Sequence, residues 1–154
     1  MGYDDIETPV ATGSDILGGS AVHAGVSASF HLPKTPEGIC RVGMVAPVGM
    51  DFSDSHQRKL EELGIDFSGV AKLPGKTFRW SGRYSGSMDN VETISTEVNV
   101  LGDFSPEIPE QWRSPRVLFC ANTHPSSQVS VLDQCPESET VSYTHLRAHE
   151  TYAD

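Results

Sequence analysis

Apolar residues follow a helical spacing early in the chain and an extended spacing soon after it. Apolar side chains recur at every fourth position after a glycine pair, which predicts a buried helix from about Ser20 to Leu32. These positions are Val22, Val26 and Phe30. The nearly continuous apolar run 41–48 predicts a strand covered on both faces, and a second helix is predicted over 55–63 with Ser53 or Asp54 as its cap. This order is typical of an α/β sheet.

The middle of the chain changes to a two-residue alternation. Phe78, Trp80 and Tyr84 fall on one face of the segment 77–84 and polar side chains on the other, which predicts a half-buried antiparallel strand. The alternation returns over 94–100 after a turn segment, so we expect the two stretches to form a hairpin.

The α/β order then resumes. We expect a short proline-led helix or turn over 106–112 and a buried strand over 117–121. A helix is predicted over 126–134, with Val129 and Leu132 facing inward. The expected fold class is therefore α/β.

Both ends of the chain depart from this rhythm. The first three residues are predicted to enter a loop where an α/β protein normally has a complete strand. Thr140 and Val141 begin a strand, but the residues after them fit neither a continued strand nor an amphipathic helix, and they resemble translated read-through of a sequencing adapter. We therefore expect a fold truncated at both ends, with one partial domain over 1–141 and a non-native tail over 142–154.

Size and charge narrow the classes of function. A chain of 154 residues fits one domain of ordinary size. With 11 Lys and Arg against 21 Asp and Glu, the formal net charge is -10, and no basic cluster is present. These features argue against nucleic acid or an anionic membrane as the main partner. No apolar run reaches the roughly 18 to 20 residues that span a bilayer.

The three cysteines give no pattern of their own. Cys40, Cys120 and Cys135 are far apart and form no C-x-x-C pair, so the sequence predicts neither a disulfide framework nor a zinc site. A reducing cytoplasm is the expected location. His145 and His149 are one helical turn apart but lack a third ligand, so we expect no metal there.

Glycines and acidic residues near the start of the chain are the first candidates for ligand binding. Gly18 and Gly19 precede a predicted helix, where glycine lets a ligand approach the backbone, although tight packing of the helix entry explains them equally well. His23 lies one turn into that helix and points back toward the same region, or is a buried histidine. Asp4 and Asp5 can offer carboxylates to hydroxyl groups, or form a solvated acidic pair.

The predicted hairpin adds Arg79 and Arg83, which share one strand face. Both can meet an anionic or polyhydroxy substrate, whereas ordinary exposed arginines do nothing specific. The chain has no nucleophile elbow and no G-x-x-x-x-G-K-[ST] loop.

Six short segments resemble the amino-terminal half of the ribokinase-like (PfkB) carbohydrate kinases. The matching segments are 4–9, 17–21, 42–51, 63–70, 76–84 and 121–125. Together they span residue 4 to about residue 141. The resemblance implies a central, mostly parallel sheet with flanking helices. It also implies a small antiparallel β lid, with lid strands over about 7–16 and 70–100.

The resemblance also implies roles for single residues. Asp4 would bind sugar hydroxyls, and Gly18 and Gly19 would contact the same sugar. His23 stands where many members carry an Asn that bonds to the sugar, and an imidazole can both donate and accept a hydrogen bond. Asn122, in the last matching segment, joins the substrate-binding set.

The resemblance places the catalytic base elsewhere. The family's Gly-Ala-Gly-Asp segment, which holds the base and the anion hole, lies in the carboxy-terminal half and has no counterpart here; Gly102 and Asp103 share two letters with it in the wrong context. We therefore expect ATP and Mg²⁺ to serve a full-length parent kinase for a sugar or nucleoside. This chain alone is expected to be inactive and to bind neither well. The alternative is a non-catalytic polyol-binding or oligomerisation module, and a homodimer through the lid fits either role.

Overall fold

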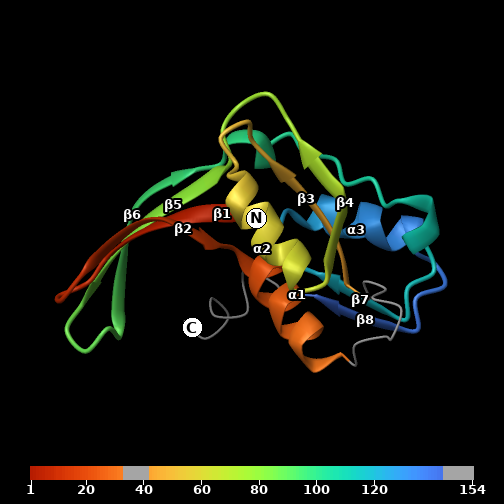
Figure 1. Ribbon diagram of the computed structural model, residues 1–154, viewed down its shortest axis with the longest axis horizontal. Helices are drawn as coiled ribbons and strands as arrows, with labels where there is room; N and C mark the ends of the chain where they lie inside the picture. The colour runs from red at the N-terminus through yellow and green to blue at the C-terminus, as the bar shows by residue number, and fades with distance from the viewer. Residues whose placement is uncertain (33–41, 144–154) are drawn as a thin grey trace, which may run out of the picture. The chain divides into compact units, whose positions relative to one another are not determined.

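The computed structural model describes residues 1–32 and 42–143, which form a mixed α/β structure (Figure 1). The strands are β1 (Gly2–Glu7), β2 (Thr12–Gly18), β3 (Val42–Val48), β4 (Ile65–Lys72), β5 (Phe78–Ser85), β6 (Asn90–Glu97), β7 (Val117–Cys120) and β8 (Thr140–Tyr143). The helices are α1 (Ser20–His31), α2 (Asp54–Glu62) and α3 (Pro125–Gln134), with short 3-10 turns η1 (Asn99–Leu101) and η2 (Glu110–Trp112). The chain divides into two compact units, Met1–Phe104 and Ser105–Asp154.

A four-stranded sheet in the order β2-β1-β5-β6 contains the predicted hairpin. Strand β1 pairs antiparallel with β2 and parallel with β5, and β5 pairs antiparallel with β6. We call these four strands the lid sheet. It brings the predicted lid segment 7–16 together with the hairpin of the middle region. The predicted lid range 70–100 also included the end of β4, but β4 pairs with β3 instead of joining the lid sheet.

The end of the hairpin differs from the prediction. Strand β6 stops at Glu97, so Val98 and Val100 do not continue the alternation. Asn99 has a φ of 49°, a left-handed conformation that breaks an extended strand, and its side chain donates a hydrogen bond to the Thr77 carbonyl. The chain therefore turns into η1 instead of extending the lid.

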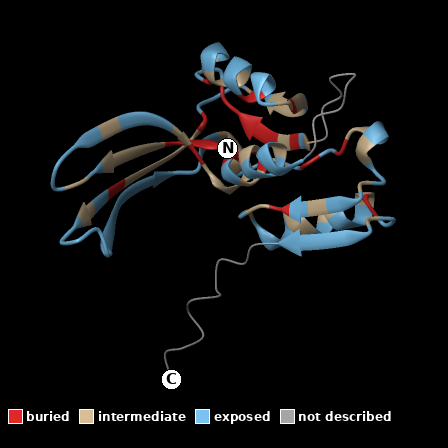
Figure 2. Cartoon of the chain, turned by 60° about the horizontal axis from the view of Figure 1, so that its bottom comes forward, coloured by how far each residue is buried: buried red, intermediate tan, exposed pale blue. Residues whose placement is uncertain are grey.

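The core of the first unit surrounds the parallel pair β3–β4. Its buried residues are Met1, Tyr3, Val22, Met44, Ala46, Val48, Phe52, Leu60 and Ile65. Helix α1 packs closely here because Gly25 has no side chain: a Cβ added to it would lie 2.8 Å from Met44 Cε. Strand β3 is buried over much of its length, whereas β6 is exposed throughout (Figure 2).

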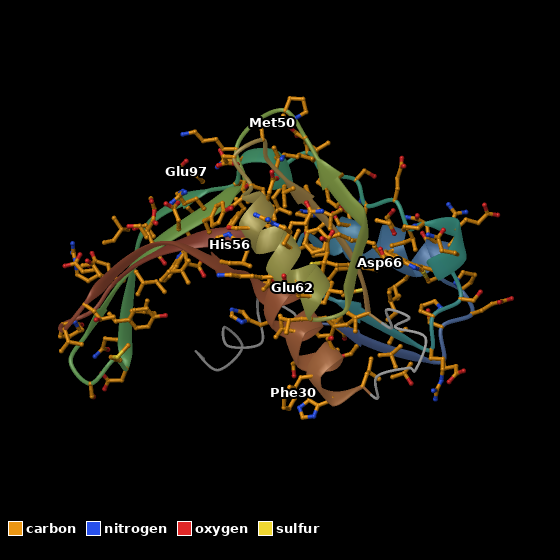
Figure 3. The ribbon with its side chains drawn as sticks, in the orientation of Figure 1. Phe30, Met50, His56, Glu62, Asp66 and Glu97 are labelled. Carbon is orange, nitrogen blue, oxygen red and sulfur yellow. The ribbon has the colours of Figure 1, made fainter. Side chains whose placement is uncertain are left out.

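Helix α1 is found as predicted, but not all of its repeated apolar residues face the core. Val22 is buried, whereas Phe30 is 83% exposed and lies near the far end of the helix (Figure 3). An α-helix has about 3.6 residues per turn, so a four-residue spacing drifts around the axis and rotates Phe30 off the buried face. Helix α2 is also confirmed, with Ser53 as its cap; the Ser53 side chain accepts a hydrogen bond from the Ser55 amide.

The beginning of the chain is a strand, not the predicted loop. β1 starts at Gly2, and Tyr3 is only 3% exposed. A Cβ on Gly2 would lie 2.6 Å from the Phe78 ring, so the glycine allows β1 and β5 to lie close together. This strand depends on pairing with a segment far along the chain, which a local pattern does not reveal.

The second unit joins the parallel strands β7 and β8 through α3. Its elements lie where the sequence predicts them, but β7 is not a buried strand, because Val117 is 63% and Phe119 is 40% exposed. Val129 and Leu132 of α3, expected to face inward, are 54% and 37% exposed. A two-stranded sheet and one helix provide too little surface to cover every apolar side chain within this unit.

The last described residues belong to β8. Ser142 and Tyr143, which the sequence assigns to the non-native tail, pair in register with Phe119 and Cys120. Residues 144–154 lie outside the described residues, as do Cys40, His145 and His149. None of the described helices is long and apolar enough to cross a membrane.

Candidate functional site

Asp4 lies inside β1, beside the end of β2. It is the third residue of the strand, which continues to Glu7. The two strands pair with Gly2 opposite Gly18 and Asp4 opposite Ile16. A Cβ built on Gly18 would lie 2.1 Å from Asp4 Oδ2, so the carboxylate occupies the space that any other residue would fill.

Gly19 turns the chain from β2 into α1. Its φ is 95°, a conformation that residues with a side chain rarely adopt. Its carbonyl accepts hydrogen bonds from the amides of Val22 and His23 at 3.0 and 3.2 Å. The helix begins without a side-chain cap and without an acidic residue in its first turn. The glycine pair therefore serves the tight helix entry and also leaves room for the Asp4 carboxylate.

Electrostatics links Asp4 to the start of α1. Burial raises the pKa of the Asp4 carboxyl above its usual value, the nearby His23 side chain opposes this rise, and the neighbouring Asp5 carboxylate adds to it. His23, although exposed, lies close enough to act on Asp4. The structure thus brings Asp4, Gly18, Gly19 and His23 together, and we call these four residues the Asp4 site.

Arg79 lies on the other face of the lid sheet. It pairs with Tyr3 across β1 and β5, one residue away from Asp4, and successive residues of a strand point to opposite faces. Its guanidinium donates hydrogen bonds to both Asp5 oxygens, at 2.9 and 2.7 Å, and to Asp15 Oδ1 at 2.5 Å. It also stands 5.5 Å from the centre of the Tyr3 ring.

These contacts hold the guanidinium in place. Hydrogen bonds to Asp15 and Asp5 raise the pKa of Arg79, and the bond to Arg79 lowers the pKa of Asp5. Asp15 reaches the pair from β2 with a φ of 56°, and its amide donates to Asp5 Oδ1 at 3.0 Å. The structure therefore does not bring Arg79 to the Asp4 site, and its role in substrate binding remains a prediction.

Asn122 belongs to the second unit, where it follows β7. In the same loop His124 caps α3, and its Nδ1 accepts a hydrogen bond from the Ser126 amide. Asn122 likewise remains a prediction from the sequence.

Sequence reasoning missed Trp80 as a neighbour of this site. The parallel register of β1 and β5 places Trp80 directly opposite Asp4, on the same sheet face. The indole ring lies over Gly82, where a Cβ would come within 2.0 Å of it, and its Nε1 donates to Thr93 Oγ1 at 3.2 Å. The alternation of the hairpin predicted the face of Trp80, but only the pairing with β1 identified Asp4 as its partner.

Across 1–32 and 42–143 no group of three His, Cys, Asp or Glu side chains lies in an arrangement that could hold a metal ion.

No family model and no curated protein matches the chain in sequence. Solved structures do match it in fold. Ribokinase from Giardia lamblia superposes with a TM-score of 0.68 at 14% identity, covering 96% of this chain and 50% of that one. Ribokinase from Thermotoga maritima has a TM-score of 0.63 at 18% identity, covering 99% and 52%. The nucleoside kinase of Methanocaldococcus jannaschii has a TM-score of 0.65 at 15% identity, covering 97% and 50%.

These likenesses establish the fold. The chain spans about half the length of the ribokinase-fold kinases that it matches. Together with the parallel pairs, the flanking helices and the lid sheet, they confirm the expected ribokinase-like α/β fold class.

Proposed function

We propose that this chain forms the substrate-binding side of an ATP-dependent kinase that phosphorylates a sugar or a nucleoside. The observation that carries the proposal is the half-buried Asp4 carboxylate, seated over Gly18 beside the start of α1. The solved structures of the same fold include ribokinases and a nucleoside kinase, which supports this class of substrate.

The chemistry of the Asp4 site suits a polyhydroxy ligand. A carboxylate can accept hydrogen bonds from two neighbouring hydroxyl groups, and these charge-assisted bonds are stronger than neutral ones. His23 can donate to or accept from a third hydroxyl. The site would hold and orient the substrate, and positioning is a large part of catalysis in phosphoryl transfer.

We assign the binding of ATP and Mg²⁺ to the remainder of a full-length kinase, because the chain spans about half the length of the ribokinase-fold kinases that it matches. We expect the chain alone to show no turnover.

Calorimetry with a panel of sugars and nucleosides tests the proposal. Replacing Asp4 by Ala should weaken binding of the preferred polyol by about 2 to 4 kcal/mol, because it removes a charged acceptor and leaves hydroxyl donors unpaired. The matched control is Asp54→Ala, which removes an exposed carboxylate whose Lys72 partner stands 3.8 Å away on the surface. Unchanged affinity in Asp4→Ala, or no binding of any polyol by the native chain, contradicts the proposal.

A second candidate function is a non-catalytic polyol-binding or oligomerisation module. The edge strand β6 favours it, because all eight of its residues are exposed, including Val91 at 55% and Ile94 at 49%. An unpaired strand edge is a template for pairing with another chain, so the lid would join two copies. Sedimentation velocity should then show a dimer that Ile94→Lys disrupts; a monomer at all concentrations argues against this candidate.

We also propose a cytoplasmic location. Cys120 and Cys135 are both buried free thiols, and burial raises the pKa of each. Unpaired thiols of this kind are typical of a reducing compartment. A fluorescent fusion that is exported from the cell would contradict this assignment.

A further inference from the structure

A buried polar cluster lies at the base of the lid sheet, where β3 ends and β5 begins. Thr77 is only 1% exposed, the most buried polar residue of the described core. Its Oγ1 donates a hydrogen bond to Asp51 Oδ1 at 2.8 Å and accepts one from the Gly49 amide at 3.0 Å. Its own amide donates to the same Asp51 oxygen at 2.7 Å. Every polar group of Thr77 thus takes part, since its carbonyl accepts from Asn99 at 3.0 Å.

The turn after β3 and the residues before β5 are in direct contact, with no space between their backbones. A Cβ on Gly49 would lie 2.3 Å from the Lys76 carbonyl carbon and from the Thr77 nitrogen, so only glycine fits there. The Met50 amide donates to the Gly75 carbonyl at 2.9 Å, and Figure 3 shows Met50 at the turn after β3. The hydrogen bonds of this turn therefore hold the residues before β5 against the end of β3.

The other strand of the hairpin is fixed at the same point. Beyond the end of β6, the Val100 amide donates to the Lys76 carbonyl at 3.2 Å, and Asn99 reaches the Thr77 carbonyl. Both strands of the hairpin are therefore anchored to the core through residues next to Thr77.

Asp51 is suited to act as the acceptor in this cluster. Burial works to raise the pKa of its carboxyl, but the hydrogen bonds from the Thr77 amide and hydroxyl outweigh that effect and hold the pKa below its usual value. The carboxylate thus stays ionised, and a charged acceptor makes the stronger hydrogen bonds.

The position of Thr77 decides what the cluster can control. Thr77 directly precedes β5, whose first residue, Phe78, pairs with Gly2, and the same register places Trp80 opposite Asp4. A shift in the position of the start of β5 would therefore alter its pairing with β1, the strand that carries Asp4. We infer that Thr77 and Asp51 are positioning residues, which fix the start of β5 and thereby its register against β1.

Backbone amide hydrogen exchange of the full chain tests this inference without any ligand. Thr77→Val keeps the volume but removes the hydroxyl, which leaves the Gly49 amide and the Asp51 carboxylate each short of one partner. Amides of β5 and β6 should then exchange about 10 to 100 times faster, as expected for the loss of buried hydrogen bonds. Those of β3 and β4 should change by less than about twofold. Thr77→Ser, which keeps the hydroxyl, should restore the native pattern.

The control is again Asp54→Ala, a neighbouring exposed carboxylate whose loss should leave exchange in β5 and β6 unchanged. Faster exchange spread evenly over 1–104, or no change in β5 and β6, would overturn the inference. If Thr77→Val does not fold, Asp51→Asn is measured in the same way, because it keeps the size and one acceptor oxygen. Exchange that is faster than in the native chain only within the lid sheet then supports the inference. Exchange that is uniformly faster, or unchanged, overturns it.

The consequence for substrate rests on the proposed function and is measured separately. In Thr77→Val, calorimetry should show weaker polyol binding together with a loosened lid sheet. If the native chain binds no polyol, the proposed function fails, whereas the exchange result still decides the positioning role.

Discussion

Asp4 and Asp5 are neighbours on β1, yet the two faces of the lid sheet give them opposite surroundings. Asp5 accepts two hydrogen bonds from Arg79, which lower its pKa. Asp4 sits over Gly18, and burial raises its pKa. On the Asp5 face the charge stabilises the fold, because an oppositely charged partner compensates for its partial burial. On the Asp4 face burial outweighs the opposing effect of His23, so the charge is held at a cost in stability.

The contacts of Arg79 explain how the Asp5 face of the lid sheet stabilises the fold. The side chains of Arg79 and Asp5 are 25% and 29% exposed, so solvent screens their ion pair less than it would on an open surface. The arginine also reaches Asp15 on β2 and the Tyr3 ring, whose hydroxyl accepts from the Ser53 amide at 3.0 Å. His56, which lies on α2 (Figure 3), is beside Tyr3, with the ring centres 5.6 Å apart. The face thus ties three strands to the helix.

The largest change in the free energy of unfolding is expected on the Asp5 face, where the carboxylate is paired with Arg79. Asp5→Asn should lower the free energy of unfolding by about 2 kcal/mol near neutral pH, because it removes the charge that Arg79 binds. Chemical denaturation followed by circular dichroism measures the loss. Glu92→Gln serves as a control, because its partner Arg83 is 49% exposed and 3.4 Å away, and screened pairs of this kind contribute little.

The pH dependence sharpens the same prediction. The folded-state pKa of Asp5 lies below its unfolded value, so its contribution is fully present above the unfolded pKa and is lost as the pH falls through the folded one. The difference between the native chain and Asp5→Asn should therefore vanish in strong acid. A difference that persists there would show that Asn disturbs packing and does not merely remove charge.

A smaller effect of opposite sign is expected on the Asp4 face. The folded-state pKa of Asp4 is raised, so its ionised form destabilises the fold above the unfolded pKa and has no such effect once both states are protonated. Asp4→Asn should raise the free energy of unfolding at neutral pH by up to about 1 kcal/mol, while weakening polyol binding. The gain should disappear on acidification. Destabilisation by Asp4→Asn at neutral pH would mean that the carboxylate is structural, and the two faces would no longer differ in kind.

Local sequence patterns predicted most elements and some of the candidate site. Helix α1, strand β3 and helix α2 have clear periodicity and end signals, and Gly64, which follows α2, has a φ of 83° as a helix-ending glycine should. The glycine pair before α1 was found from its residue type alone, since few other residues tolerate the conformation of Gly19.

Long-range pairing accounts for the errors. Strand β1 was missed because its identity depends on β5, and the faces of Asp4 and Arg79 follow from a parallel register that no local pattern contains. The cluster around Thr77 joins residues from three separate segments, so neither Asp51 nor Asn99 stood out in the sequence.

The amino-acid sequence by itself determined the types of element and their order, because helix and strand periodicity, capping residues and glycine conformations are properties of a few consecutive residues. Only the tertiary structure decided which of two adjacent carboxylates is paired and which lies over a glycine. That choice depends on which strand lies beside β1 and in what register, and the chain specifies both through contacts between segments far apart in sequence. The same holds for burial: the patterns of β3 and β7 are similarly apolar, but β3 is largely buried whereas two of the four residues of β7 are exposed, because burial is set by the layers that pack against a strand.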